Sequence, residues 1–290
     1  MLTRVTLPSY TYHYAATEFG NIAYRETGKG APAIFVHGVF LNGHLWDRVI
    51  EHLGDVRRCI AVDLLAHGKT AARADQNLSF EAQADMLVAF CNAMGLDRVD
   101  VVANDSGSAI AQIFAARHPE RIESLTLTNG DIHDNWPPKQ AEPLIKLAKE
   151  GGLGPVGQRM LSDLAFARAN FASGFEHPDW LLPEDFKIWL EPLFESQQST
   201  RNLERFIASF DNRQTVEIEP LLRKLQAPTL IVWGTGDTFF STDWALWLRD
   251  TIPGVREVVE LRDAKLFFPL ERPDELAAAL RKFWREQPSR

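Results

Sequence analysis

Cysteine is scarce in this chain of 290 residues, where only Cys59 and Cys91 occur, each within an apolar stretch. A disulfide framework is therefore not expected, and two core thiols suit a reducing compartment. No stretch reaches the roughly 18 apolar residues of a membrane-spanning helix. Residues 1–14 are too polar for a signal peptide. We expect a cytoplasmic protein with no membrane partner.

Basic residues are fewer than acidic ones, with 31 Lys and Arg against 39 Asp and Glu, which gives a net charge of −8. Such a surface repels polyanions, so nucleic acid is not an expected partner. Gly-rich phosphate loops and clustered basic motifs are also missing, and nothing indicates a metal or another cofactor. We expect a monomer or homodimer that takes a small, largely neutral and apolar substrate.

Short apolar runs alternate with helical patterns through the first half of the chain. One such helix is predicted over residues 79–95, with Ser79 as its N-cap and Gly95 at its C-terminal end. This alternation is typical of βαβ units and predicts an α/β fold with a mostly parallel sheet. The predicted strands are residues 31–38, 57–68, 97–104, 121–130, 227–234 and 255–264, and a final amphipathic helix follows from residue 272.

Residues 134–221 differ from the rest because prolines and aromatic residues punctuate their helical stretches. We interpret this region as a helical cap inserted into the α/β core. The core then comprises residues 1–133 and 222–290, so the sheet begins, is interrupted by the cap, and is completed afterwards.

The stretch ANDSGS, residues 103–108, connects a predicted strand to a predicted helix. A strained turn that presents one side chain needs small neighbours, since strand and helix backbones approach closely there. Ala103, Gly107 and Ser108 provide small residues two before, two after and three after Asp105. Centring the turn on Ser106 would put Asn104 at the first small position, which fits less well. Asp105 is the predicted presented residue, and an ordinary turn with an aspartate N-cap is the alternative.

Two further segments supply groups that such a residue needs for catalysis. His37 and Gly38 follow an early strand, where the backbone N–H of Val39 can join that of Ser106 in an oxyanion hole. Asp237 follows a later strand, where a carboxylate would orient an imidazole.

Together, the stretches HG, ANDSGS, WGTGD and FFPLERPDEL, in this order, resemble the α/β-hydrolase fold superfamily in its aspartate-nucleophile branch. The resemblance covers nearly the whole chain. It implies that Asp105 attacks a saturated carbon to form an alkyl ester, and that a histidine activates the water that hydrolyses it. Haloalkane dehalogenases and epoxide hydrolases of this branch work in this way.

The catalytic histidine of that branch is missing, because its place in DAKLFFPLERP, residues 263–273, falls on Leu266. Leucine cannot accept a proton. We expect Leu266 to lie near Asp105 and Asp237, and Asp237 to have a raised pKa or a polar partner other than imidazole. His133 opens the cap at a strand end and is the candidate for the relocated base, or else a hinge residue; Lys265 is interpreted as solvated.

The groups that would hold a leaving group are also missing. The residue after Asp105 is Ser106, where the resemblance to haloalkane dehalogenases implies a tryptophan, and no arginine follows closely as in fluoroacetate dehalogenases. All tyrosines lie before the cap, which disfavours the epoxide chemistry that uses two cap tyrosines. We place His37, Trp136 and Trp180 at the substrate pocket, although His37 also suits a structural role and the tryptophans also suit packing.

Three functions remain open at this point. The chain is a hydrolase of small organic substrates with an atypical or relocated base, or a lyase, isomerase or cyclase in which Asp105 shuttles a proton. A binding protein that kept the pocket is the third hypothesis, which the strained carboxylate disfavours.

Overall fold

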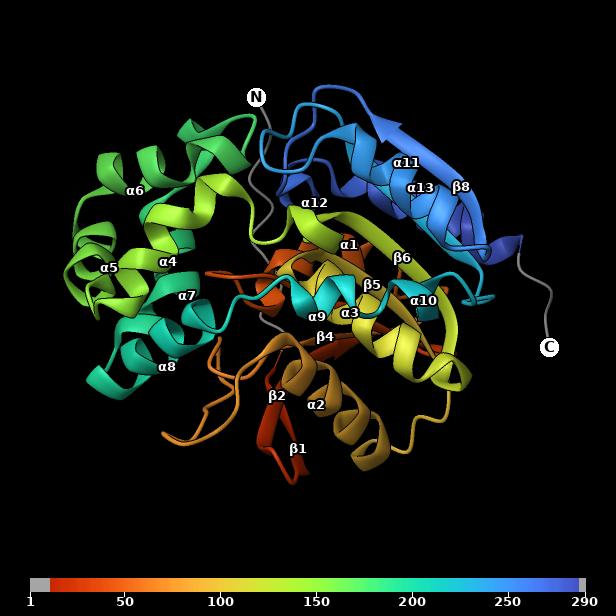
Figure 1. The fold of residues 1–290 in the computed structure, drawn as a ribbon, viewed down its shortest axis with the longest axis horizontal. Coiled ribbons are helices and arrows are strands. Elements are labelled where there is room, and N and C mark those ends of the chain that lie inside the picture. The colour runs from red at the N-terminus through yellow and green to blue at the C-terminus, as the bar shows by residue number, and fades with distance from the viewer. Residues whose placement is uncertain (1–10, 287–290) are drawn as a thin grey trace.

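The computed structural model describes residues 11–286, so the N-terminal segment through Tyr10 lies outside the described residues. An eight-stranded sheet, in the order β1-β2-β4-β3-β5-β6-β7-β8, runs through the molecule (Figure 1). Its strands are β1 (His13–Thr17), β2 (Gly20–Thr27), β3 (Pro32–Val36), β4 (Arg58–Val62), β5 (Val99–Asp105), β6 (Ile122–Gly130), β7 (Thr229–Gly234) and β8 (Val255–Leu261).

The predicted α/β class and mostly parallel sheet are confirmed. Strands β3 to β8 pair in parallel, whereas β1 and β2 join the β4 edge in antiparallel pairs. Strands β3 and β5 to β7 are buried along nearly their whole length, as expected for a parallel sheet with both faces covered.

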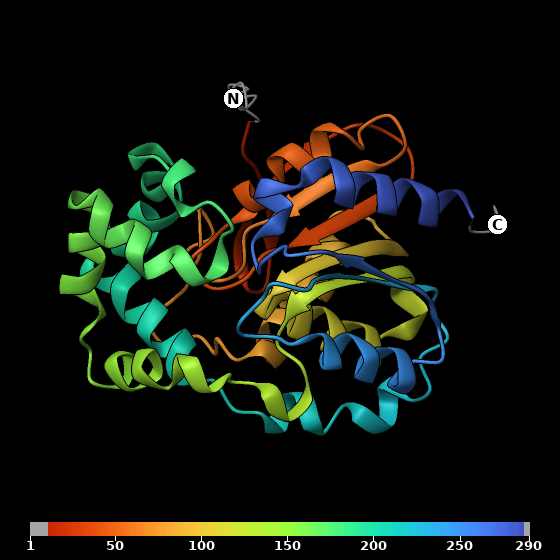
Figure 2. The same cartoon turned by 90° about the horizontal axis from the view of Figure 1, so that it is seen from above.

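Helices cover both faces of the sheet. Figure 2 shows α1 and α13 on one face and α2, α3 and α11 on the other. The predicted caps of α2 are present, since the Ser79 side chain accepts from the N–H of Ala82 and Gly95 has a φ of +64°. These helices are α1 (Asp47–Glu51), α2 (Phe80–Ala93), α3 (Ser106–Arg117), α11 (Thr242–Thr251), α12 (Phe268–Glu271) and α13 (Pro273–Arg285).

A second helical layer lies beyond one end of the sheet (Figures 1 and 2). It contains α4 (Glu142–Lys149), α5 (Leu153–Ser162), α6 (Leu164–Phe171), α7 (Pro183–Phe194) and α8 (Gln197–Ala208). The short helices α9 (Arg213–Val216) and α10 (Glu219–Leu222) instead pack against α3 of the core. We call the layer of helices α4 to α8, residues 142–208, the cap. The division of the chain into a core and a cap over residues 134–221 stays a prediction.

Short 3-10 helices connect these elements. They are η1 (Gly43–Trp46), η2 (Pro119–Arg121), η3 (His133–Asn135), η4 (Lys139–Ala141), η5 (Ala172–Gly174) and η6 (Pro178–Trp180). Among the helices of residues 11–286, none is both long and apolar enough to cross a membrane.

Candidate active site

Asp105 ends β5 and precedes α3 with φ 56° and ψ −133°, a conformation that costs a residue with a side chain on the order of 1–3 kcal/mol. The close approach that the sequence predicts is present around it. A Cβ on Gly107 would lie 2.5 Å from the carbonyl oxygens of Val36 and His37, and one on Gly130 would lie 2.3 Å from the carbonyl oxygen of Asp105. The strand-to-helix turn thus holds the Asp105 side chain up at the carboxyl edge of the sheet.

Two backbone N–H groups act on the Asp105 carboxyl, those of Ser106 and Val39. Its Oδ2 atom is buried and has no hydrogen-bond partner among the described residues. Burial outweighs the two N–H groups and, together with the nearby charge of Asp237, raises the pKa of Asp105 to about 7. The carboxyl is therefore part ionised near neutral pH.

Asp105 lies at the base of an apolar cavity of about 430 Å³ between core and cap. Its walls are mostly aliphatic and aromatic, a composition that suits a small apolar ligand. The lining residues are Val39, Phe40, Asp105, Ser106, Asp131, Pro138, Gln140, Ala141, Pro143, Leu144, Leu147, Leu153, Val156, Met160, Asn170, Phe171, Gly174, Phe210, Phe239, Phe240, Leu266 and Phe267.

Leu266 borders this cavity beside Asp105, and its carbonyl oxygen accepts from the Asn104 side chain at 2.9 Å. This bond ties the segment after β8 to the residue before Asp105. No histidine is among the lining residues that the structure describes, and this aliphatic side chain occupies the position that the sequence resemblance assigns to the base.

Asp237 follows β7 and has polar partners in place of an imidazole. Its Oδ1 accepts from the N–H of Phe239 at 2.8 Å, and its Oδ2 accepts from the Asn129 side chain at 2.9 Å. Burial raises the pKa of Asp237 to about 6, despite these donors.

Asp131 is a further carboxyl of the cavity that the sequence patterns did not single out as catalytic. It immediately follows β6, is 3% exposed and shares a hydrogen bond with the Ser106 side chain. Burial and the charge of Asp105 raise its pKa well above the usual range. Its place directly after a buried parallel strand was the signal in the sequence, since the carboxyl ends of such strands meet at one edge.

His133 is not among the residues that line the cavity, contrary to its expected role as relocated base. Its Nε2 lies 2.9 Å from Glu219 Oε2 and its Nδ1 lies 3.2 Å from Asp134 Oδ1. Its ring also packs on Trp247, with centroids 4.8 Å apart. These contacts turn the imidazole toward α10 and α11, which matches the alternative interpretation as a hinge residue.

The three residues that we placed at the substrate pocket lie elsewhere. His37 is fully buried below the cavity, where its Nε2 accepts from the N–H of Leu64 at 3.0 Å and its Nδ1 donates to the carbonyl oxygen of Gly38 at 2.8 Å. Burial lowers the pKa of His37 well below its usual value, which keeps the ring neutral. Trp136 is fully buried and stacks on Phe80 of α2 with ring centroids 4.0 Å apart, so it packs in the core.

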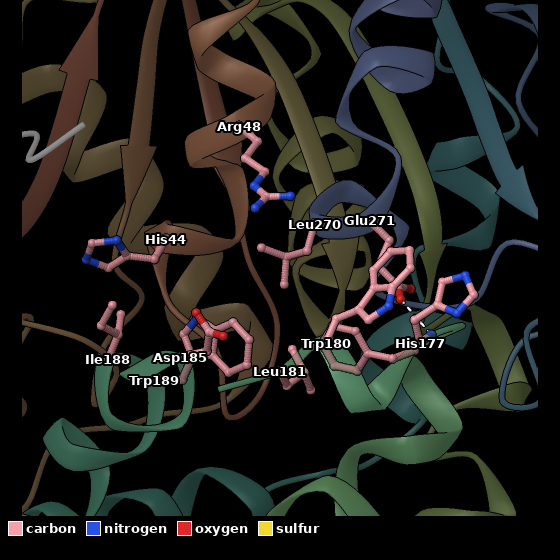
Figure 3. Close-up of a pocket in the computed structure, with 11 residues that line it drawn as sticks. His44, Arg48, His177, Trp180, Leu181, Asp185, Ile188, Trp189, Leu270 and Glu271 are labelled. Carbon is pink, nitrogen blue, oxygen red and sulfur yellow. Dashed lines mark hydrogen bonds between the residues drawn. The ribbon is translucent and has the colours of Figure 1, made fainter. Parts of the chain in front are cut away.

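Trp180 borders a smaller cleft on the other side of the cap, shown in Figure 3. It is 47% exposed and stacks on His177 with centroids 3.8 Å apart. Arg48 and Leu270 reach into this cleft from the core. The exposed indole therefore belongs to the seam between cap and core rather than to the Asp105 cavity.

The family model described as alpha/beta hydrolase fold matches residues 32–271. The chain belongs to this family. It is similar, at 27% identity over 90% of each chain, to haloalkane dehalogenase 2 of Mycobacterium bovis. Its identity to a haloalkane dehalogenase of Agrobacterium fabrum is also 27%, over 89% of this chain and 86% of the relative. The sequence resemblance to the dehalogenase branch is confirmed, and this hydrolase-family chain is an enzyme.

The solved structures with the same fold include a haloalkane dehalogenase and an epoxide hydrolase. Haloalkane dehalogenase DbeA from Bradyrhizobium elkani superimposes with a TM-score of 0.79 at 20% identity, over 96% of this chain and all of the other. An epoxide hydrolase superimposes with a TM-score of 0.79 at 20% identity, over 96% and 99% of the two chains. These likenesses establish the fold and leave the chemistry to the site.

Proposed function

We propose that this hydrolase acts on a small, largely apolar organic substrate through a covalent ester on Asp105. The observation that carries the proposal is the carboxyl of Asp105, which borders the apolar cavity while two backbone N–H groups face it. A carboxylate so placed can attack a saturated carbon that the cavity holds above it.

Hydrolysis of the ester then returns the free enzyme. Water attacks the carbonyl carbon of the ester, and negative charge develops on its oxygen. The N–H groups of Val39 and Ser106 face that carboxyl and stabilise this oxyanion. The relatives named dehalogenases support the class of reaction, whereas the leaving group of this chain's own substrate is a separate question.

Intact-protein mass spectrometry tests the nucleophile directly. The parent, Asp105→Asn and Ser106→Ala are incubated with 1-bromobutane, styrene oxide and 4-nitrophenyl butyrate. We expect an alkyl adduct on the parent and on Ser106→Ala, and none on Asp105→Asn, whose amide is not an anionic nucleophile. An active Asp105→Asn together with an inactive Ser106→Ala contradicts the proposal, as does an acyl adduct on Ser106.

A second candidate function follows from the high pKa of Asp105 and the carboxyl of Asp131 beside it. A carboxyl that titrates near neutral pH can shuttle a proton in a lyase, isomerase or cyclase reaction. Conversion of a substrate with no adduct at any time point favours this candidate over the hydrolase.

A further inference from the structure

Asp131 is fixed to the strand-to-helix turn by its backbone. Its N–H donates to the carbonyl oxygen of Asp105 at 3.3 Å, and Gly130 before it pairs with Asp105 in the β5–β6 register. The Gln112 side chain, from the next turn of α3, donates to the carbonyl oxygen of Asp131 at 3.0 Å. The position of Asp131 relative to Asp105 is therefore set by the sheet and by α3 rather than by a free loop.

The side chain of Asp131 enters the same cavity as Asp105. The groups that act on its charge are Asp105, at the end of β5, and the Ser106 hydroxyl, at the start of α3. Asp237 after β7 acts on Asp105, and the nearby imidazole of His133 is engaged by Glu219 and Asp134. No cation is among the described groups that act on Asp105 or Asp131.

Two carboxyls in one apolar cavity without a cation do not both ionise, because the first charge opposes the second in a medium of low dielectric constant. Asp105 has two backbone N–H donors, whereas Asp131 has one hydroxyl donor. Donors stabilise the charged form, so Asp105 holds the charge and Asp131 holds the proton. The site thus contains an anionic nucleophile beside a neutral carboxylic acid.

We propose that Asp131 is both the proton donor to a leaving oxygen and, once deprotonated, the base that replaces the missing histidine. This proposal rests on the proposed function, since it requires an ester on Asp105. It names a substrate class in which carbon is displaced from oxygen, of which a small apolar epoxide is the simplest member.

Asp105, Asp131, the epoxide and one water account for every proton in the proposed reaction. A carboxylate oxygen of Asp105 forms a bond to a ring carbon, the carbon–oxygen bond breaks, and the ring oxygen takes the electron pair and the Asp131 proton. Water then attacks the ester carbonyl while one of its protons passes to the Asp131 carboxylate. The tetrahedral intermediate expels the alcohol oxygen, which takes the remaining water proton from the carboxylic acid formed on Asp105. Asp105 is then a carboxylate, Asp131 is an acid, and the product is a diol.

The lining of the cavity favours an oxygen leaving group over a halide. A halide departs as an anion and needs N–H donors around it, while a neutral acid gives it nothing. The lining residues that the structure describes include no tryptophan, histidine, lysine or arginine, and the two lining amides, Gln140 and Asn170, each donate an N–H to a backbone carbonyl oxygen, that of Thr238 and that of Phe166. They include no tyrosine either, so Asp131 is the acid that can reach a ring oxygen there.

The decisive variant is Asp131→Asn, tested with styrene oxide and with 1-bromobutane. Asparagine keeps the shape but has no acidic proton, so alkylation by styrene oxide falls at least about 100-fold. Alkylation by 1-bromobutane stays near the parental rate, because bromide leaves without a proton. In the parent, styrene oxide turns over, while the butyl ester persists because Asp131 keeps its proton. Asp134→Asn, a change at an exposed carboxyl three residues on, is the matched control and behaves as the parent.

Each result decides a separate point. Parental turnover of styrene oxide by Asp131→Asn, or equal loss of both reactions, overturns the role of Asp131. A parent that reacts with 1-bromobutane but not with styrene oxide overturns the substrate class. A parent that forms no adduct and turns over neither probe overturns the proposed function itself. Should Asp131→Asn fold poorly, kcat/KM of the parent for styrene oxide must still decline at alkaline pH as Asp131 loses its proton, and a flat profile contradicts the proposal.

Discussion

Leu266 shows at the scale of one residue how a side chain limits a reaction. It borders the cavity beside Asp105, and Asp237, the acid that would orient a histidine, is instead satisfied by Asn129 and the N–H of Phe239. Under the proposed function, position 266 offers no proton acceptor, so we expect an ester formed without proton transfer to persist.

Replacing Leu266 with histidine should therefore turn a persistent adduct into turnover. We expect the butyl ester from 1-bromobutane to remain on the parent and to disappear from Leu266→His with multiple release of butanol, measured by intact mass and gas chromatography. Leu266→Gln, polar but not basic, is the control and should keep the adduct. A persistent adduct in Leu266→His would show that position 266 does not face the attacking water.

The carboxyl of Asp105 also links stability to pH. Its pKa is raised from 3.8 to about 7 by burial, so the folded state retains a proton that the unfolded chain has lost. Stability is therefore highest below the unfolded pKa and falls as pH rises toward 7, by up to about 1.4 kcal/mol per pH unit for this group.

Asp105→Asn removes this titration, so it should stabilise the protein at pH 8 and have little effect at pH 4. Urea unfolding of parent and variant at the two pH values measures the difference. Asp134→Asn, at an exposed site, should show no such pH dependence. An equal change of stability at both pH values would mean that burial does not hold a proton on Asp105.

At the scale of elements, the loop after β3 and the turn after β5 form one unit. Gly38 lies against the nucleophile, where an added Cβ would be 2.1 Å from Asp105 Oδ2. The next residue, Val39, supplies an N–H to the same carboxyl. Glycine at this position thus permits the contact on which the proposed oxyanion hole depends.

Gly38→Ala should leave the fold intact and slow the turnover of styrene oxide at the ester-hydrolysis step, because the methyl group displaces the carboxyl or the N–H of Val39 from the arrangement that stabilises the oxyanion. A loss of at least about 100-fold is expected from the cost of one oxyanion donor. Gly154→Ala is the matched control, since its Cβ would meet nothing closer than 3.7 Å. Full activity of Gly38→Ala would contradict the arrangement of this loop.

At the scale of the whole molecule, the segment that contains Leu266 also holds the cap. The N–H of Phe267 donates to the carbonyl oxygen of Gly174 at 2.9 Å. Both oxygens of Glu271 accept from the cap, from the N–H groups of Glu176 and His177 at 2.8 Å each (Figure 3). The segment that contains Leu266 therefore also attaches the cap to the core.

Glu271→Gln replaces one acceptor oxygen by an amide group and leaves a cap N–H without a partner. The cost is on the order of 1–3 kcal/mol, so the melting temperature should fall and KM should rise more than kcat changes. Hydrogen exchange of residues 172–181 measures the loosening directly. Glu275→Gln, at a half-exposed carboxyl on α13, is the control. Equal hydrogen exchange of residues 172–181 in Glu271→Gln and Glu275→Gln would show that Glu271 does not hold the cap.

The sequence predicted the features that depend on neighbouring residues. The parallel strands, the capped helix α2 and the turn at Asp105 follow from apolar runs, cap residues and small side chains within a few positions. The edge strand β1 and its neighbour β2 were not among the predicted strands, because β1 has a single buried side chain and one of the four buried residues of β2 is the charged Arg25. The pairing of β2 with β4 depends on contacts across more than thirty positions of the chain.

The tertiary structure, by contrast, decided where individual side chains point. Asp131 and His133 lie two residues apart after the same strand, yet the register with β5 places one carboxyl in the cavity, while Glu219 and Trp247 hold the imidazole away from it. Trp136 and Trp180, both placed at the substrate pocket from the sequence, differ in the same way, one stacked in the core and one exposed at the seam. Local pattern fixes which residues reach the sheet edge, but the direction of each side chain depends on partners distant in sequence, because packing and hydrogen bonds across elements set the final rotamers.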